Sequence, residues 1–203
     1  MEPDRAARGV EGMEIAAQPA APFGVDDVIA REGAAAHVRV RTSGESFEAF
    51  WQRERASVGR ALAVTIGDIQ LAAEATDEAM ARAYQHWAKV SALDSPAGWV
   101  YRVGLNWSRS VLRRLRRTPP AWLAQAATHH DQYGPDPSVA AAMSALPSAQ
   151  REVVVCRLLL GLSEAQTATA LRLQPGTVKS RLSRALRSLQ TSLAHLDPQE
   201  PLS

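Results

Sequence analysis

Helix start and stop signals are densest in the last third of the chain. Pro147 opens the segment "PSAQREVVVCRLLLG" and Gly161 closes it, an order that follows from the backbone preferences of proline and glycine. Ser163 stands three residues before Gln166, so the serine can cap a second helix while the glutamine side chain reaches back to the cap. Pro175 then starts a third helix. Helix, tight turn and helix in this order predict a helix-turn-helix.

The third helix, "PGTVKSRLSRALRSLQ", divides into two faces when it is turned by about 100° per residue. One face is apolar and contains Val178, Leu182, Ala185, Leu186 and Leu189. The opposite face carries Ser180, Ser183, Arg184 and Arg187, with Lys179 and Arg181 at its edges. A recognition helix needs this division, because one face fixes it on the domain while the other enters the major groove. A solvated basic face on a three-helix bundle gives the same pattern, so this helix alone does not decide between the two.

A second basic segment, "SPAGWVYRVGLNWSRSVLRRLRR", contains no acidic residue and begins with a serine cap followed by proline. On the expected helix one face gathers Arg102, Arg109, Arg113 and Arg116, beside Asn106 and Trp99. Such an arginine ladder can track phosphates, and Trp99 can either stack on an unpaired base or pack in the core. We expect Trp107 to pack in the core. This segment favours nucleic-acid binding more strongly than the helix-turn-helix does alone.

Composition limits the class of protein. Residues 1–94 contain fifteen acidic and ten basic residues, a net charge of −5, whereas residues 95–203 contain six and thirteen, a net charge of +7. This asymmetry suits an acidic partner such as DNA, although a basic face is often only solvated. The five histidines and the single cysteine, Cys156, show no metal-ligand spacing, and no phosphate-binding glycine loop is present. We therefore expect no catalytic residues, no metal and no cofactor, and hence no enzyme.

Two features of the sequence, the position of Cys156 and the lack of long apolar stretches, indicate the cellular compartment of the protein. Cys156 lies in the apolar run "VVVCRLLL", which indicates a core residue in a reducing compartment. No apolar stretch reaches the roughly 18 residues of a membrane span, and the start of the chain lacks a signal-peptide pattern. We expect a cytoplasmic protein with no membrane partner.

The expected fold is all-α, because helical spacing recurs and no strand-like alternation occurs. We expect two small helical domains joined by a flexible linker, the second domain being the helix-turn-helix. The first domain spans residues 46–118, the linker 119–141, which holds four prolines, and the second domain 142–193. We expect residues 1–45 to be a largely disordered extension with a short helix at "VDDVIARE", and 194–203 to be a tail.

Three segments in this order resemble a known family. They are "LAAEATDEAMARAYQHW", "SPAGWVYRVGLNWSRSVLRR" and "LPSAQREVVVCRLLLGLSEAQTATALRLQPGTVKSRLSRALRSL". The chain resembles the extracytoplasmic-function (ECF) group of bacterial RNA polymerase sigma factors, compact members of the sigma-70 family that keep regions two and four. The resemblance covers residues 46–118 and 142–190.

The resemblance implies three functional surfaces. A core-polymerase surface for the clamp helices of the largest subunit would contain Glu74, Asp77 and Glu78. A surface that opens the −10 promoter element would contain Trp99, Arg102, Asn106, Arg109, Arg113 and Arg116, with the loop "ALDSPAG" beside a flipped base. A surface that reads the −35 element would contain Thr177, Lys179, Ser180, Ser183, Arg184 and Arg187, on a domain that also binds the polymerase β-flap. The implied partners are core RNA polymerase and promoter DNA, with an anti-sigma factor as a further candidate.

Two positions depart from the family pattern. Asp77 stands where glutamine is usual, and Arg172 stands where the turn of the helix-turn-helix usually has glycine. If Arg172 adopts the left-handed conformation, the strain is about 1 kcal/mol.

Two other binding functions compete with the sigma-factor hypothesis. A stand-alone helix-turn-helix regulator would leave the basic helix of residues 95–117 unexplained. An anti-sigma or adaptor protein would not need two acid-free basic helices.

Overall fold

The computed structural model describes residues 44–117 and 137–194. Over these ranges the chain is helical and contains no strand, which confirms the predicted all-α class. None of the helices in the same ranges is long and apolar enough to cross a bilayer. The predicted helix at residues 25–32, the first part of the predicted linker and the chain beyond residue 194 lie outside the described residues.

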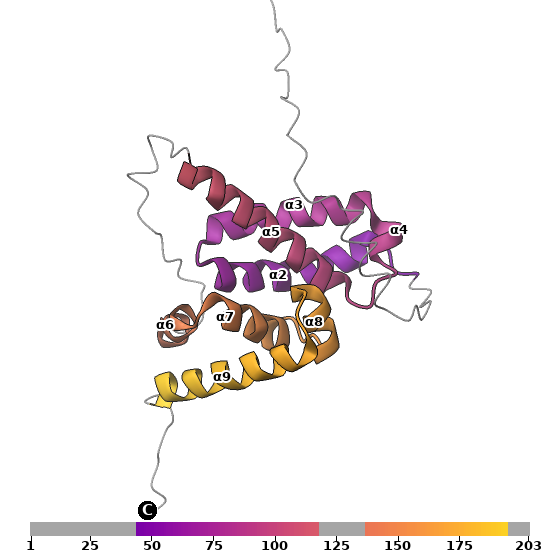
Figure 1. Ribbon diagram of the computed structural model, residues 1–203. Helices are drawn as coiled ribbons and strands as arrows, with labels where there is room; N and C mark the ends of the chain where they lie inside the picture. The colour runs from indigo at the N-terminus through magenta and orange to yellow at the C-terminus, as the bar shows by residue number, and fades with distance from the viewer. Residues whose placement is uncertain (1–43, 118–136, 195–203) are drawn as a thin grey trace, which may run out of the picture.

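The helices form two groups, which Figure 1 shows one below the other. The first group consists of α2 (Phe47–Ile66), α3 (Ile69–Gln85), the short α4 (Trp87–Val90) and α5 (Pro96–Arg117). The second consists of α6 (Pro137–Ala145), α7 (Ser148–Val154), the π-helical turn η2 (Val155–Leu159), α8 (Glu164–Leu171) and α9 (Pro175–Leu193).

Local caps fix the ends of the helices in the first group. The Ser46 side chain accepts from the Ala49 N–H at the start of α2, and Gly67 ends α2 with a φ of 78°. Asp68 follows at once and caps α3, accepting from the Leu71 N–H at 2.9 Å. At the start of α5 the Ser95 Oγ accepts from the Gly98 N–H at 3.1 Å, as the serine-proline pair predicted. Because the C-cap Gly67 of α2 is followed directly by the N-cap Asp68 of α3, the chain reverses here and α3 packs along α2.

The second group follows the predicted sequence signals closely. Gly161 has a φ of 62° after η2, and both bonds of the predicted capping box between Ser163 and Gln166 are formed, at 2.9 and 3.1 Å. Pro175 is in the first turn of α9, as predicted. The start of α6 at Pro137 differs from the prediction, because helix was expected only from about residue 142. Proline in the first turn and a run of alanines favour this earlier start.

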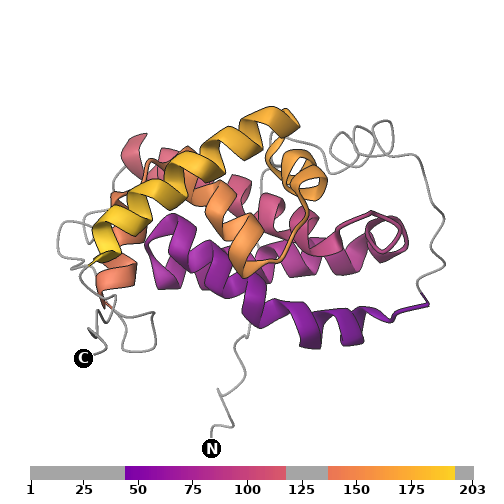
Figure 2. The ribbon, with the colours of Figure 1, turned by 90° about the horizontal axis from the view of Figure 1, so that it is seen from below.

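The two groups are packed against each other. One apolar cluster runs through both and joins Phe50, Leu62, Trp99, Val100 and Tyr101 to Leu146, Val154, Val155, Cys156, Leu162 and Ala170. A smaller second cluster lies within the second group and consists of Val153, Ala168 and Val178. Figure 2 views the molecule from below and shows the second group in front of α2. The run "VVVC" is buried, as predicted, but it contributes to both clusters. Val153 belongs to the smaller cluster, and Val154, Val155 and Cys156 belong to the shared one.

Gly104 marks the closest approach of α5 to the other helices of its group. A Cβ at this position would lie 2.7 Å from the Leu62 Cδ1 and 3.0 Å from the Ala75 carbonyl oxygen. By contrast, a Cβ at Gly59 of α2 would meet its nearest atom, the Thr76 Oγ1, at 3.6 Å, an ordinary van der Waals distance. Of these two glycines, only Gly104 is therefore required by packing.

Gly104→Ala and Gly59→Ala should thus differ in stability although both gain the same helix propensity. We expect the free energy of unfolding of Gly104→Ala to be lower than that of Gly59→Ala by about 1–3 kcal/mol, because the added methyl overpacks the core. Urea unfolding followed by circular dichroism measures both. Equal free energies of unfolding would show that α5 can move aside at no cost.

Candidate nucleic-acid interface

Helix α9 presents one packed face and one exposed polar face. Val178 and Ala185 are fully buried, and Leu182 and Leu189 are partly buried against the core. Leu186 was placed on the same apolar face, but that prediction is wrong: its side chain is 42% exposed, because the second group supplies nothing to cover this edge of the helix.

The predicted −35 residues lie on the exposed face of α9. Lys179, Ser180, Ser183, Arg184 and Arg187 are exposed, whereas Thr177 is half-buried. The Arg184 Nε donates to the Ser180 carbonyl oxygen at 3.2 Å, which lays this arginine along the helix surface. Within the described residues no carboxylate forms an ion pair with a basic side chain of α9. This face therefore offers cations and hydroxyl donors to an external anion.

Helix α5 carries the predicted −10 residues, and the structure divides them. Arg109, Arg113 and Arg116 are exposed and Asn106 is half-buried, so these four share an accessible stretch of the helix. They occupy its second half, where the other helices do not cover it.

The prediction that Trp99 and Arg102 face DNA is wrong for this arrangement. Trp99 is 1% exposed and belongs to the shared apolar cluster, and Arg102 is 5% exposed. The Arg102 Nη1 lies 3.4 Å from the Thr169 carbonyl oxygen of α8, because the second group covers the first half of α5. Trp107, expected as a core residue, is partly buried against the same cluster.

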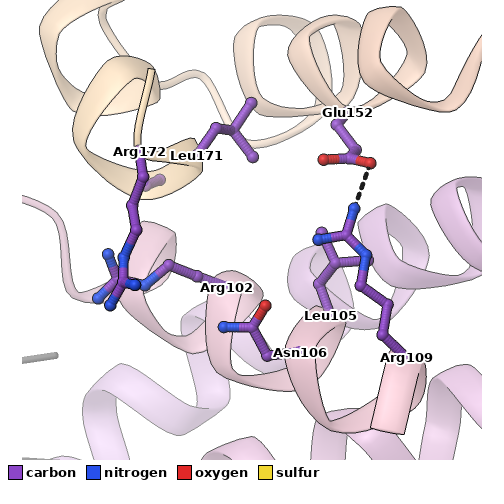
Figure 3. Close-up of a pocket in the computed structure, with 8 residues that line it drawn as sticks. Arg102, Leu105, Asn106, Arg109, Glu152, Leu171 and Arg172 are labelled. Atoms are coloured by element: carbon purple, nitrogen blue, oxygen red, sulfur yellow. Dashed lines mark hydrogen bonds and ion pairs between the residues drawn. The ribbon is translucent and has the colours of Figure 1, made fainter. Parts of the chain in front are cut away.

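A cleft of about 190 Å³ lies where α5 meets the second group. Its lining residues are Arg102, Leu105, Asn106, Arg109, Glu152, Ala170, Leu171 and Arg172 (Figure 3). The Arg109 Nη2 donates to the Glu152 Oε1 at 2.6 Å, and the Glu152 side chain is only 12% exposed. Sequence reasoning missed Glu152, since it lies on α7 and no local pattern connects it with α5.

Two further polar contacts join the two helix groups. The Gln166 Nε2 donates to the Asp94 carbonyl oxygen at 3.0 Å, so the capping glutamine also holds the loop before α5. The Arg151 guanidinium donates to the Thr65 carbonyl oxygen near the end of α2 at 3.2 Å. Neither contact had a signal in the sequence, because each joins segments far apart along the chain.

Burial suppresses ionisation at this junction. Burial raises the pKa of the Tyr101 hydroxyl well above its usual range, and Tyr101 pairs with the Thr65 Oγ1 at 2.8 Å. Burial, followed by the nearby Glu152 carboxylate, likewise raises the pKa of the Cys156 thiol well above its usual range. Both groups are neutral at physiological pH, so the junction contains an un-ionised thiol.

The acidic surface on α3 is accessible. Glu74 and Asp77 are exposed and Glu78 is half-buried, on the side of α3 opposite the fully buried Ala79 and Ala83. Two of the acids have internal partners. The Asp77 Oδ1 accepts from the Arg55 Nη2 at 2.8 Å, and the Glu78 Oε1 from the Arg82 Nη2 at 2.7 Å. Among the described residues, no three histidine, cysteine or acidic side chains gather as a metal site would require.

The chain is similar to known proteins along most of its length. The family model described as Sigma-70, region 4, matches residues 138–189. The RNA polymerase sigma-E factor of Streptomyces antibioticus is 34% identical over 125 residues, which cover 59% of this chain and 68% of that protein. The ECF RNA polymerase sigma factor SigM of Mycobacterium tuberculosis is 30% identical over 155 residues, which cover 75% of this chain and 79% of SigM.

Two solved structures share the fold. The sigma factor RpoE, crystallised with the anti-sigma factor NepR from Bartonella quintana, superposes with a TM-score of 0.58 at 23% identity and covers 73% of this chain and 96% of that one. CnrH, solved in complex with the cytosolic domain of CnrY, superposes with a TM-score of 0.50 at 24% identity. The match covers 84% of this chain and 96% of CnrH. These similarities support the helical architecture described above.

Arg172 ends α8 in the left-handed conformation, with φ 53° and ψ 49°. Elsewhere in the described ranges positive φ occurs only at glycine. A side chain costs about 1 kcal/mol in this conformation. The Arg172 N–H donates to the Thr169 carbonyl oxygen, and the Leu173 N–H donates to the Ala168 carbonyl oxygen. These two bonds close the end of α8. The turn keeps its geometry in spite of the missing glycine.

Arg172→Gly should relieve this strain. We expect its free energy of unfolding to rise by about 0.5–1 kcal/mol. Arg172→Ala removes the same side chain without easing the backbone, so it should not gain stability. Thermal unfolding of both variants measures the difference, and equal midpoints would mean that the arginine side chain, rather than its φ, sets the stability of the turn.

Proposed function

Because the chain belongs to the extracytoplasmic-function sigma factors of RNA polymerase, we propose that it directs initiation by reading the −35 element with α9 and opening the −10 element with α5. The observation that carries the proposal is the exposed face of α9, whose cations and hydroxyls have no carboxylate partner among residues 44–117 and 137–194. Major-groove recognition needs such a face on a helix whose other side is anchored in the domain.

The −35 assignment separates two kinds of contact. Arg184 lies near the middle of the exposed face of α9, where a guanidinium can bind a guanine edge through two hydrogen bonds. Lys179 lies at the edge and near the start of the helix, where phosphates pass. The serines Ser180 and Ser183 supply short donors between these two positions. Base reading is therefore assigned to the centre of the face and positioning to its margin.

The −10 assignment rests on the accessible half of α5. Arg109, Arg113 and Arg116 follow one another along the exposed side and are spaced to track a single-stranded backbone. Asn106 lines the cleft beside them and supplies an amide that can bond to a base edge. Opening of the duplex then draws on binding energy for the separated strand. No covalent step is required of this chain, and bond formation belongs to the polymerase.

The polymerase contacts are assigned to the acidic surface of α3 and to the second helix group. Glu74, Asp77 and Glu78 offer negative charge to the clamp helices of the largest subunit, and the second group would bind the β-flap. The structures of RpoE and CnrH each contain another protein in complex, and NepR, the partner of RpoE, is an anti-sigma factor. These complexes support an anti-sigma factor as a further partner of this chain.

Reconstitution with core RNA polymerase tests the proposal. The full-length chain is added to core enzyme and a library of promoter fragments, and start sites are mapped by sequencing the run-off transcripts. A sigma factor yields defined starts preceded by two common elements. A stand-alone helix-turn-helix regulator would bind duplex DNA without conferring initiation, and that result would overturn the proposal.

Arg184→Ala and Lys179→Ala should have effects of different kinds. Arg184→Ala should reduce initiation most on the native −35 sequence, with a loss of discrimination of roughly 1–3 kcal/mol against a scrambled element. Lys179→Ala should weaken both promoters by a similar factor, since it removes a phosphate contact. Both variants are measured on both promoters at one salt concentration. An equal loss on the two promoters for Arg184→Ala would remove base reading from this residue.

Glu78→Lys should weaken the binding of core polymerase. The substitution places a cation against the basic clamp surface and next to Arg82, and we expect a loss of about 1–3 kcal/mol in binding. Glu48→Lys, the same charge change on an exposed site of α2, is the matched control. Fluorescence anisotropy of the labelled chain with core enzyme measures both affinities. Equal affinities for the two variants would move the clamp contact away from α3.

A further inference from the structure

The cleft between α5 and the second helix group carries more positive than negative charge on its walls. Arg102, Arg109 and Arg172 line it, and Glu152 is the one acidic side chain among the described residues that do so. Because Glu152 is paired with Arg109, one of the three arginines already neutralises its carboxylate. The surplus is two guanidinium groups, and these stay charged whether they are exposed or buried. A cleft with this surplus favours an anion.

The two ends of the cleft differ in charge, as Figure 3 shows. The Arg109–Glu152 pair lies at one end, and the side chains of Arg102 and Arg172 reach toward the other end from α5 and from the end of α8. The contact of Arg102 with the Thr169 carbonyl oxygen, at 3.4 Å, holds its guanidinium there. Two like charges that share one end of a cleft repel each other, and an anion between them is attracted to both. The favoured position for an anion is therefore the end away from Glu152.

The other walls of the cleft suit a phosphate group. Asn106 is half-buried and lines the cleft from α5, where its amide can donate to a phosphate oxygen. Leu105 and Leu171 add apolar surface, which lowers the local dielectric and strengthens the attraction between opposite charges. Two guanidinium groups match the charge of a phosphate or diphosphate better than that of a single carboxylate, and their planar donors suit its oxygens.

The C-terminus of α8 does not oppose an anion at this end. Free carbonyl groups at a helix C-terminus repel negative charge. Here the Thr169 carbonyl oxygen accepts from the Arg172 N–H, and the Ala168 carbonyl oxygen accepts from the Leu173 N–H. These last carbonyls of α8 are satisfied by the turn, so the arginine side chains set the charge of this end.

The backbone of Arg172 is an independent reason to expect a ligand. Its φ of 53° is strained for a residue with a side chain, and glycine would remove the strain. Strained backbone positions gather at ligand sites, where the side chain has a use that offsets the strain. Within residues 44–117 and 137–194 no ion pair supplies that use for Arg172. Its side chain is exposed and lines the cleft, where an external anion can supply it.

The size and shape of the cleft limit the ligand. Its volume of about 190 Å³ is roughly six times the share of one water molecule in the liquid, which is enough for a phosphate or diphosphate group. A DNA backbone continues in both directions from each phosphate, whereas the packing of α8 on α5 closes the cleft on one side. A terminal phosphate continues in one direction only, so it fits this shape better.

We propose that the cleft binds the terminal phosphate or diphosphate group of a small molecule, with Arg102 and Arg172 as its charge partners and Asn106 as a hydrogen-bond donor. The inference goes beyond the proposed function, because it needs neither promoter DNA nor core polymerase. A bound phosphate joins α5 to the end of α8, so it raises the stability of the free protein.

Inorganic diphosphate is the probe, titrated into the full-length chain by calorimetry without metal ions and at constant ionic strength. Arg172→Gln removes one cation from the cleft, and Arg60→Gln, an exposed arginine of α2 that bonds to Ser57, is the matched control. We expect the Kd of Arg172→Gln to rise about tenfold, since a charge-assisted contact is lost, and that of Arg60→Gln to stay within about twofold of wild type. Equal affinities of the two variants would overturn the proposal.

A second arm tests the assignment to a terminal group. ADP carries its diphosphate at one end, so it should bind at least as tightly as inorganic phosphate and with the same loss in Arg172→Gln. Exclusion of ADP by a protein that binds free diphosphate would overturn the terminal-group assignment.

Arg172→Gly separates binding from folding. We expect this variant to be more stable than wild type without ligand, but diphosphate should raise its unfolding midpoint less than it raises that of wild type. Diphosphate should also slow the modification of Arg172 by phenylglyoxal, followed by mass spectrometry, more than that of Arg60. An equal rise of the two midpoints, or equal slowing at the two arginines, would show a general attraction of anions to the basic chain and would overturn the site.

Discussion

The described structure depends on one apolar contact, formed where Val154, Val155 and Cys156 of α7 and η2 pack against α2 and α5. The neighbouring Val153 points the other way, into the small cluster with Ala168 and Val178 that belongs to the second group alone. A cluster of that size gives a domain of about 50 residues little stability by itself, because small domains bury a low fraction of their apolar surface. The second group is therefore stabilised in part by the surface on which it rests, and its position is coupled to its stability.

Polar bonds give this contact its orientation. Apolar surfaces attract without direction, whereas the bonds of Arg151 to the end of α2, of Glu152 to Arg109 and of Gln166 to the Asp94 carbonyl fix the register of α7 and α8 on the first group. The Arg109–Glu152 pair lies at the rim, where water can replace either partner, so separation leaves no unpaired charge in a dry interior. Contacts between domains of one chain are often of this mixed kind and permit motion.

Local signals predicted local structure, and distant contacts had no local signal. Gly161, Ser163 with Gln166, and Pro175 set helix ends through their own backbone and side-chain chemistry, and each behaves as the sequence indicates. A helical wheel identifies the faces of α5 but does not say what covers them, which is why Trp99 and Arg102 were assigned to DNA and are buried. The partner of Arg109 is a carboxylate on another helix, and spacing along α5 carries no information about it. Leu186 shows the converse, an apolar residue on the expected face that no neighbouring helix reaches.

Positive charge is stabilised differently at the C-terminal end of α5 and at Arg109. Arg113, Arg114, Arg116 and Arg117 lie in the last turns of the helix, where the negative end of the macrodipole offsets positive charge. This cluster can stay exposed on a helix that contains no acidic residue. Arg109 lies farther from the helix end, where the dipole contributes little, and it pairs with the Glu152 carboxylate of α7. An isolated cation beside an apolar junction gains most from a strong acceptor, and the Glu152 carboxylate supplies one at this position. The helix thus combines an exposed basic end with a neighbouring arginine that is paired across the junction between the two groups.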